Sequence, residues 1–143
     1  MPMNELKADI LRPDAASFNF APADRIVDLA LSNGLATRGH ALLWFGATPP
    51  WMEAITDPVE LERVLVRHIE TVMDRYRGRV PSWDVLNEPI AFEPTDRAPL
   101  RDTSWLRVMG PPRTFTSLSG VLLSRMVSGT AWLRLASRTS CSA

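Results

Sequence analysis

A long amphipathic helix between two continuously apolar runs constrains the fold of this chain more than any other feature. In the segment "TDPVELERVLVRHIETVMDRYRG", Asp57 can cap a helix, Pro58 suits its first turn and Gly78 ends it. Apolar side chains recur there at helical spacing, at Leu61, Val64, Leu65, Ile69, Val72, Met73 and Tyr76. The apolar runs at residues 36–44 and 80–88 do not alternate, which is typical of parallel strands covered on both faces. This order predicts a parallel α/β fold, either a barrel or a doubly wound sheet.

Another amphipathic helix is expected at residues 22–33, before the first apolar run. Gly34 directly follows it and provides a stop signal. Its apolar face is formed by Ile26, Val27, Leu29 and Ala30. The predicted order is therefore helix, strand, helix, strand, as in repeated strand and helix units.

Polar and aromatic side chains gather where the two apolar runs end. Trp44 ends the first run, and Asn87 and Glu88 end the second. Further candidates lie within the first run and near the start of the chain: His40, Asn4 and Lys7. Because the carboxyl ends of parallel strands open onto one face, we expect these side chains to lie near one another. Polar groups beside flat apolar rings suit a sugar.

These stretches resemble the motifs of a known family. "RGHALLWFGATPPW" followed by "WDVLNEP" is similar to glycoside hydrolase family 10, the endo-β-1,4-xylanases. The resemblance extends upstream through "NELKADILRPDAASFNFAPADRIVDLALSNGL" and downstream to "LRDTSWLRVMG", covering roughly residues 3–110. It implies an α/β fold that is a partial TIM (β/α)8 barrel, covering roughly strands 2 to 4. A complete barrel needs about 250 residues and eight strand and helix units.

The resemblance also implies roles for individual residues. Glu88 matches the general acid/base that protonates the leaving glycosidic oxygen, and Asn87 matches the residue that binds the sugar 2-hydroxyl. The other matching positions hold sugar hydroxyls or supply an aromatic ring: His40, Lys7, Asn4 and Trp44. The implied reaction is retaining hydrolysis of β-1,4-xylan or xylo-oligosaccharides, with no cofactor and no metal.

Some positions depart from the family pattern. The family has Glu at the position of Met3 and His at the position of Phe45, so one carboxylate and one polar ring are missing. The second catalytic carboxyl must lie about 5 to 5.5 Å from the first, and in the family it comes from a later strand. Asp84 is excluded, since four strand residues place it roughly 13 Å from Glu88. Spacing does not exclude three loop acids, Glu53, Glu93 and Asp96.

Two other functional interpretations stay open. The chain can be a catalytically inactive homologue that retains at most weak binding of xylo-oligosaccharides. It can also be related to other barrel glycosidases that share the Asn-Glu pair, such as cellulases or mannanases, although "RGHALLW" argues against this. Whichever interpretation holds, we expect the isolated chain to be inactive, because the strand that carries the family's nucleophile is not part of its sequence.

Several other residues have structural interpretations. His68, beside Arg67 in the long helix, is expected on the surface. Trp83 is expected in the core, and Arg38 is expected to pair with an acid near the barrel mouth. Trp51 borders the loop after the first strand, where it can face a sugar.

Charge and composition exclude other classes of function. The chain has 16 basic and 16 acidic residues, so no global field favours nucleic acid or an anionic membrane. Cys141 is the single cysteine, which excludes an internal disulfide and a cysteine-based zinc site. Neither a signal peptide nor a transmembrane span is expected. The family implies a secreted or periplasmic location, and the oligomeric state stays open.

The last part of the chain has a different composition. Residues 111–143 contain no Asp or Glu, and all acids of the chain lie before Gly110. Apolar clusters occur there without clean helical spacing. We therefore divide the chain into a partial family 10 barrel at residues 1–110 and a tail at 111–143. The tail is expected to be disordered or to result from a change of reading frame.

Overall fold

The computed structural model describes residues 4–95, 98–126 and 132–136. The α-helices are α1 (Ala8–Leu11), α2 (Ala21–Ser32), α3 (Pro50–Glu53), α4 (Pro58–Arg75), α5 (Ser104–Met109) and α6 (Pro111–Met126). A 3-10 turn, η1, covers Phe45–Ala47. The strands are β1 (Arg38–Trp44), β2 (Ser82–Asn87), β3 (Ile90–Thr95), β4 (Ala98–Leu100) and β5 (Trp132–Ala136).

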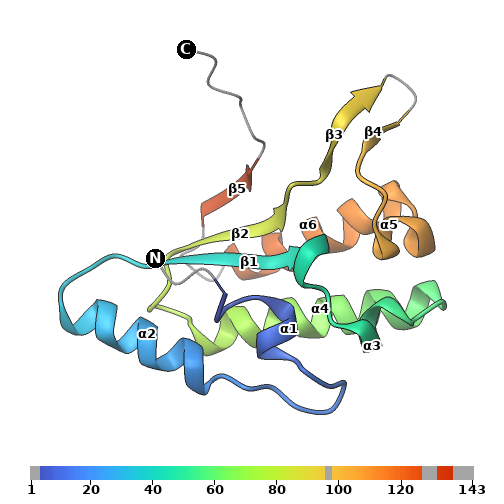
Figure 1. Ribbon diagram of the computed structural model, residues 1–143. Coiled ribbons are helices and arrows are strands. Elements are labelled where there is room, and N and C mark those ends of the chain that lie inside the picture. The colour runs from blue at the N-terminus through green and yellow to red at the C-terminus, as the bar shows by residue number, and fades with distance from the viewer. Residues whose placement is uncertain (1–3, 96–97, 127–131, 137–143) are drawn as a thin grey trace.

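The central sheet is parallel and has the order β1-β2-β5. In Figure 1, α4 runs along this sheet, and the carboxyl ends of β1 and β2 point towards the β3–β4 side of the molecule. The chain then leaves β2 and forms an antiparallel hairpin from β3 and β4. The expected parallel arrangement of the two apolar runs is therefore confirmed, with a crossover helix between them.

Helix α4 begins where the sequence predicted. The Asp57 carboxylate accepts hydrogen bonds from the backbone N–H groups of Val59, at 2.9 Å, and Glu60, at 2.7 Å. These bonds satisfy two donors that the first helical turn leaves without intrahelical partners. The helix ends at Arg75, three residues before Gly78, which has a φ of 72°. Glycine adopts that φ without steric strain, so it suits the turn towards β2.

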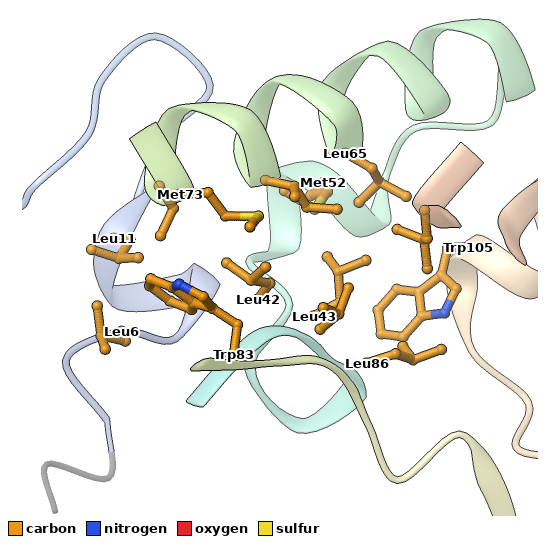
Figure 2. Packing of buried hydrophobic residues seen from close by; sticks show 14 of the residues in the cluster. Leu6, Leu11, Leu42, Leu43, Met52, Leu65, Met73, Trp83, Leu86 and Trp105 are labelled. Carbon is orange, nitrogen blue, oxygen red and sulfur yellow. The ribbon is translucent and has the colours of Figure 1, made fainter. Parts of the chain in front are cut away.

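One hydrophobic core fills the space between the sheet and α4. Figure 2 shows Leu65 and Met73 of α4 extending towards Leu42 and Leu43 of β1. Trp83 is buried at 3% exposure, which confirms its predicted place in the core. Its ring lies against Gly39 on the neighbouring strand, and a Cβ atom at Gly39 would stand 2.0 Å from Trp83 Cε3. Glycine is therefore required at this position by the packing of the ring.

His68 was expected on the surface, and this prediction is wrong. Its side chain is fully buried in α4, and Nε2 lies 3.0 Å from the carbonyl oxygen of Leu42. Since a carbonyl only accepts hydrogen bonds, Nε2 carries the proton. Nδ1 is buried without a hydrogen-bond partner in the part of the chain that the structure describes. Burial, and then the nearby charge of Arg12, lower the pKa of His68 to about 4.

The start of the expected tail is helical rather than irregular. Helix α6 contacts α4 and α5, and its Thr114 and Leu118 are buried one turn apart. The residues directly before these two, Arg113 and Ser117, both donate hydrogen bonds to the carboxylate of Glu62 in α4. Tertiary contacts thus stabilise a segment whose apolar spacing alone did not predict a helix. The proposed origin of the tail in another reading frame stays a prediction.

Neither a membrane-spanning helix nor a metal-binding cluster occurs in residues 4–95, 98–126 and 132–136. Within them, no helix combines the length and the apolar character needed to cross a membrane. Their His, Cys, Asp and Glu side chains do not form a group of three or more that could hold a metal ion.

Candidate active site

The exits of β1 and β2 lie side by side. Trp44 and Asn87, the last residues of these strands, are partners in the parallel register. Glu88 follows Asn87, and its Oε2 atom accepts a hydrogen bond of 3.3 Å from Nε1 of Trp44. Both side chains are partly buried. The register of the sheet therefore brings together an aromatic ring, an amide and a carboxyl, as the two motifs predicted.

The backbone of Glu88 has an unusual conformation. Its φ is 50°, in the left-handed region that side chains with a Cβ atom rarely adopt. This residue redirects the chain from β2 into the β3–β4 hairpin, and Pro89 follows it. The conformation costs about 1–2 kcal/mol and persists only where neighbouring contacts enforce it.

Arg101, which sequence reasoning missed, contacts this turn. Its Nε atom donates a 3.1 Å hydrogen bond to the carbonyl oxygen of Glu88, and its backbone N–H donates one of 2.8 Å to the carbonyl oxygen of Pro89. The guanidinium carbon lies 4.1 Å from the centre of the Phe45 ring. Phe45 therefore supports Arg101 through a cation–π contact. In the sequence, Arg101 stands within "LRD" of the downstream motif, but the motif alone did not show that its side chain would contact Glu88.

Lys7 and Asn4 reach the site from the start of the chain. Nζ of Lys7 donates a 2.9 Å hydrogen bond to Oδ1 of Asn4, and lies 4.4 Å from the centre of the Trp44 ring. Lys7 thus contacts the same indole that contacts Glu88. Residues 4–7 form a turn, which is closed by a 2.9 Å hydrogen bond from the Lys7 backbone N–H to the Asn4 carbonyl oxygen.

His40 belongs to a second polar cluster, with Arg38 and Asp84. Nδ1 of His40 lies 3.0 Å from Oδ2 of Asp84, its register partner on β2. Arg38 donates two hydrogen bonds to the same carboxylate, one of them 3.1 Å long from Nε. Arg38 therefore pairs with an acid, as expected, but it does so at the amino end of β1 and not near the barrel mouth. The Asp84 contact fixes the orientation of the imidazole, so Nε2 is the ring atom with which His40 can bind a ligand.

Asp84 is held as a carboxylate at the centre of this cluster. Its burial raises the pKa, but the hydrogen bonds from Arg38 and His40 together outweigh that effect and lower the pKa of Asp84 below its ordinary value. With both oxygens occupied by these partners, it acts as a structural anion. This supports the exclusion of Asp84 as the second catalytic carboxyl.

The other candidates lie outside the contacts just described. Trp51, which could have faced a sugar, donates a 2.9 Å hydrogen bond from Nε1 to the carbonyl of Arg12 and stacks on its guanidinium at 4.7 Å. It therefore has a structural role. Glu53 is exposed at the end of α3. The side chain of Glu93 and all of Asp96 lie outside the described residues.

Comparison with known proteins assigns these motifs to one family. Residues 1–119 match the model of glycosyl hydrolase family 10. The chain belongs to glycosyl hydrolase family 10. The match reaches nine residues beyond Gly110, where we had placed the end of the resemblance, and so includes the first half of α6. Family 10 membership also accounts for the parallel sheet and its crossover helix.

Relatives and solved structures of family 10 agree with this assignment. A β-1,4-xylanase of Dictyoglomus thermophilum is 39% identical over 109 residues, which are 76% of this chain and 30% of the relative. A psychrophilic family 10 endo-β-1,4-xylanase has a TM-score of 0.81 at 26% identity, over 90% of this chain and 42% of that structure. Xylanase 10B from Thermotoga petrophila, solved with xylobiose, has a TM-score of 0.74 at 33% identity, over 81% and 35%. The chain thus spans about a third of the length of the curated relatives it matches.

Proposed function

We propose that this chain is the acid/base segment of an endo-1,4-β-xylanase that acts with retention of configuration. The observation that carries the proposal is the contact between Nε1 of Trp44 and the Glu88 carboxyl at the exits of two paired parallel strands. The family motifs stand in register on these two strands. Relatives in the family are named as xylanases, and one solved relative holds xylobiose.

Glu88 has the role of proton donor in this proposal. As a carboxylic acid it protonates the glycosidic oxygen while the nucleophile of a later strand attacks the anomeric carbon. As a carboxylate it then takes a proton from the water that hydrolyses the glycosyl-enzyme. Nε1 of Trp44 donates to Oε2 of Glu88 and so orients the carboxyl group at the exit of β2.

The remaining site residues bind the sugar. Asn87 lies beside Glu88 and suits a contact with the 2-hydroxyl of the sugar. Lys7, held by Asn4 over the Trp44 ring, and His40, oriented by Asp84, present donors for neighbouring hydroxyls. Phe45, where the family has a polar ring, offers an apolar surface instead. We therefore expect weaker binding of xylo-oligosaccharides than in family members with His at that position.

Calorimetric titration with xylotriose and cellotriose tests the binding part of the proposal. We expect xylotriose to bind more tightly than cellotriose, and Trp44→Ala to weaken xylotriose binding at least about tenfold, or about 1.4 kcal/mol. Trp44→Phe and Trp51→Phe form a matched pair, since each deletes one indole N–H donor. The first should weaken binding and the second should not. Equal affinity for the two trisaccharides would remove support for a xylan substrate.

Hydrolysis of an aryl β-xylobioside tests the catalytic part. We expect no turnover by the 143-residue chain, because Asp84, the acid of β2, is engaged by Arg38 and His40. Turnover that disappears in Glu88→Ala would contradict this expectation. Loss of the same turnover in Glu53→Ala would then identify a substitute nucleophile. Binding without turnover corresponds to the alternative of an inactive homologue.

A further inference from the structure

The parallel pairing of β1 with β2 is irregular in its middle. His40 pairs with Asp84, and further along the strands Trp44 pairs with Asn87. Four residue steps on β1 therefore stand beside three residue steps on β2. β1 thus has one extra residue between the two side chains that it contributes to the candidate site. Such an extra residue is a β-bulge, a feature that often redirects a side chain next to an active site.

The bulge falls at Ala41 and Leu42. Within the described strands, neither residue has a register partner on β2. The alternation of a regular strand is also lost, because Ala41, Leu42 and Leu43 are buried one after another. An extra residue changes the face on which the following side chains lie. The bulge therefore determines the direction of Trp44 relative to His40.

The offset has a specific consequence where the strands end. A regular pairing continued from His40 and Asp84 would place Trp44 opposite Glu88. With the bulge, Trp44 lies opposite Asn87 instead, and its Nε1 atom donates to the carboxyl group of the next residue, Glu88. The contact between the ring and the carboxyl group is thus observed together with the bulged register.

The side chain of His68 binds the bulge from the crossover helix. α4 runs along the sheet (Figure 1), and Nε2 of His68 donates a 3.0 Å hydrogen bond to the carbonyl oxygen of Leu42. This carbonyl belongs to one of the two residues that the pairing with β2 passes over. A buried carbonyl group without a donor costs free energy, so the bond favours the bulged form of the strand.

Packing alone does not account for an imidazole at this position. The ring is fully buried and stacks on Phe18, with 6.2 Å between the ring centres and 11° between the planes. Among the described residues, Nδ1 has no hydrogen-bond partner. Burial of a polar ring is costly unless the ring is hydrogen-bonded, and an apolar side chain would fill the same space without that cost. The bond to Leu42 is therefore the interaction that distinguishes His68 from an apolar residue.

We propose that His68 is a positioning residue of the candidate active site. Its Nε2–H group holds the bulge at Leu42 and thereby sets the direction of Trp44 relative to His40. The effect on sugar binding rests on the proposed function, in which Trp44 and His40 contact the sugar. The effect on the strand itself does not.

The variants His68→Gln and His68→Met test the proposal as a matched pair. Both side chains are unbranched, similar in length and suited to a helix, but only glutamine has a donor for the Leu42 carbonyl. In the 15N-labelled 143-residue chain, NMR records the Nε1–H signal of Trp44 and the ring signals of His40. We expect His68→Met to shift both sets of signals, and His68→Gln to leave them near their original positions.

Calorimetric titration with xylotriose adds the functional readout. His68→Met should weaken binding at least about fivefold, whereas His68→Gln should stay within about twofold of the original chain. If the original chain does not bind xylotriose, the proposed function loses its support. The NMR comparison still decides whether His68 positions Trp44 and His40, since it requires no ligand.

Tyr76→Phe is the control for a general loss of stability. It removes the 3.1 Å hydrogen bond from the Tyr76 hydroxyl group to Asp24, which lies at the other end of α4 from the bulge contact, and it keeps the buried ring. We expect neither the NMR signals nor the xylotriose affinity to change. Unshifted signals in a folded His68→Met variant overturn the proposal, as do equal shifts in His68→Met and in either His68→Gln or Tyr76→Phe. If circular dichroism shows that His68→Met does not fold, the donor serves the whole fold rather than the bulge, and the proposal is also overturned.

Discussion

The two ends of β1 have opposite chemistry. At the carboxyl end, Trp44 contacts both Glu88 and Lys7, so charged and polar groups converge on one aromatic ring. At the amino end, Leu29 and Leu35 surround an apolar groove. Convergent polar groups beside a ring suit a small hydroxylated ligand, whereas the groove at the amino end is lined mainly by apolar side chains. A single strand thus connects two surfaces of opposite polarity.

Gly39→Ala is expected to have the largest effect, because it disrupts the packing of Trp83 in the hydrophobic core that supports both ends of β1. A Cβ atom there would stand 2.0 Å from the Trp83 ring, and the buried ring cannot move aside. We expect a loss of at least about 3 kcal/mol of unfolding free energy, measured by urea denaturation, together with loss of xylotriose binding. Gly120→Ala is the control, since open space surrounds that helical glycine and the change should stabilise by about 0.5–1 kcal/mol. Equal stability of the two variants would refute the packing argument.

Acid should destabilise the core beneath both ends through His68. The pKa of His68 is lowered to about 4 in the folded state, so between pH 6.5 and 4 the unfolded chain binds more protons. The contribution of His68 to the free energy of unfolding is therefore fully present above about pH 6.5. It is lost as the pH falls to about 4 and below, by about 3 kcal/mol in total. His68→Gln keeps a donor for the Leu42 carbonyl but does not titrate. Urea denaturation at several pH values should show that the free energy of unfolding of this variant no longer falls between pH 6.5 and 4. If it falls as in the original chain, other groups cause the pH dependence.

Asp84→Asn is expected to weaken the polar cluster that lies between the two ends of β1. Asp84 contacts Arg38, at the groove, and His40, towards the proposed sugar site. Removal of its charge should destabilise the fold by about 2 kcal/mol, less than for a fully buried pair because the Arg38 side chain is 37% exposed. His40 would also lose its orientation, so xylotriose affinity should fall. Asp28→Asn breaks a more exposed pair with Arg79 and should change stability by less than about 0.5 kcal/mol.

The smallest effect is expected at the start of α4, away from the polar contacts of either end. Asp57→Ala removes the acceptor for two backbone donors and should cost about 1 kcal/mol. Asp57→Asn retains an acceptor and should cost a few tenths of that amount. Because the cap contacts neither site, xylotriose binding should not change. A change in affinity would show that α4 couples the cap to the carboxyl end.

Local signals and the family motifs made much of the fold predictable from the sequence. The cap at Asp57 and the proline after it place the start of α4 correctly, and the two apolar runs are the two strands. The burial of His68 could also have been predicted from the sequence, since His68 lies three residues after Leu65 and four before Val72 on the apolar face of the helix. The polar neighbour Arg67 misled the interpretation, because adjacent helical residues point in different directions.

Contacts that depend on tertiary structure were not predictable. α6 is held by Arg113 and Ser117 on Glu62, and nothing in its own spacing shows that partner. Arg101 reaches Glu88 only because the β3–β4 hairpin returns the chain to the exit of β2. The motifs thus predicted a carboxyl at the exit of β2, but not the residues that support its backbone.

Protein engineers who work with this chain face a conflict at residue 88. Glycine or asparagine would fit the left-handed backbone there with less strain, so a library ranked by heat resistance alone will enrich such replacements. Every enriched clone of that kind would lack the proposed proton donor. A screen for thermal tolerance therefore has to keep this codon fixed, or include a carbohydrate readout in each round.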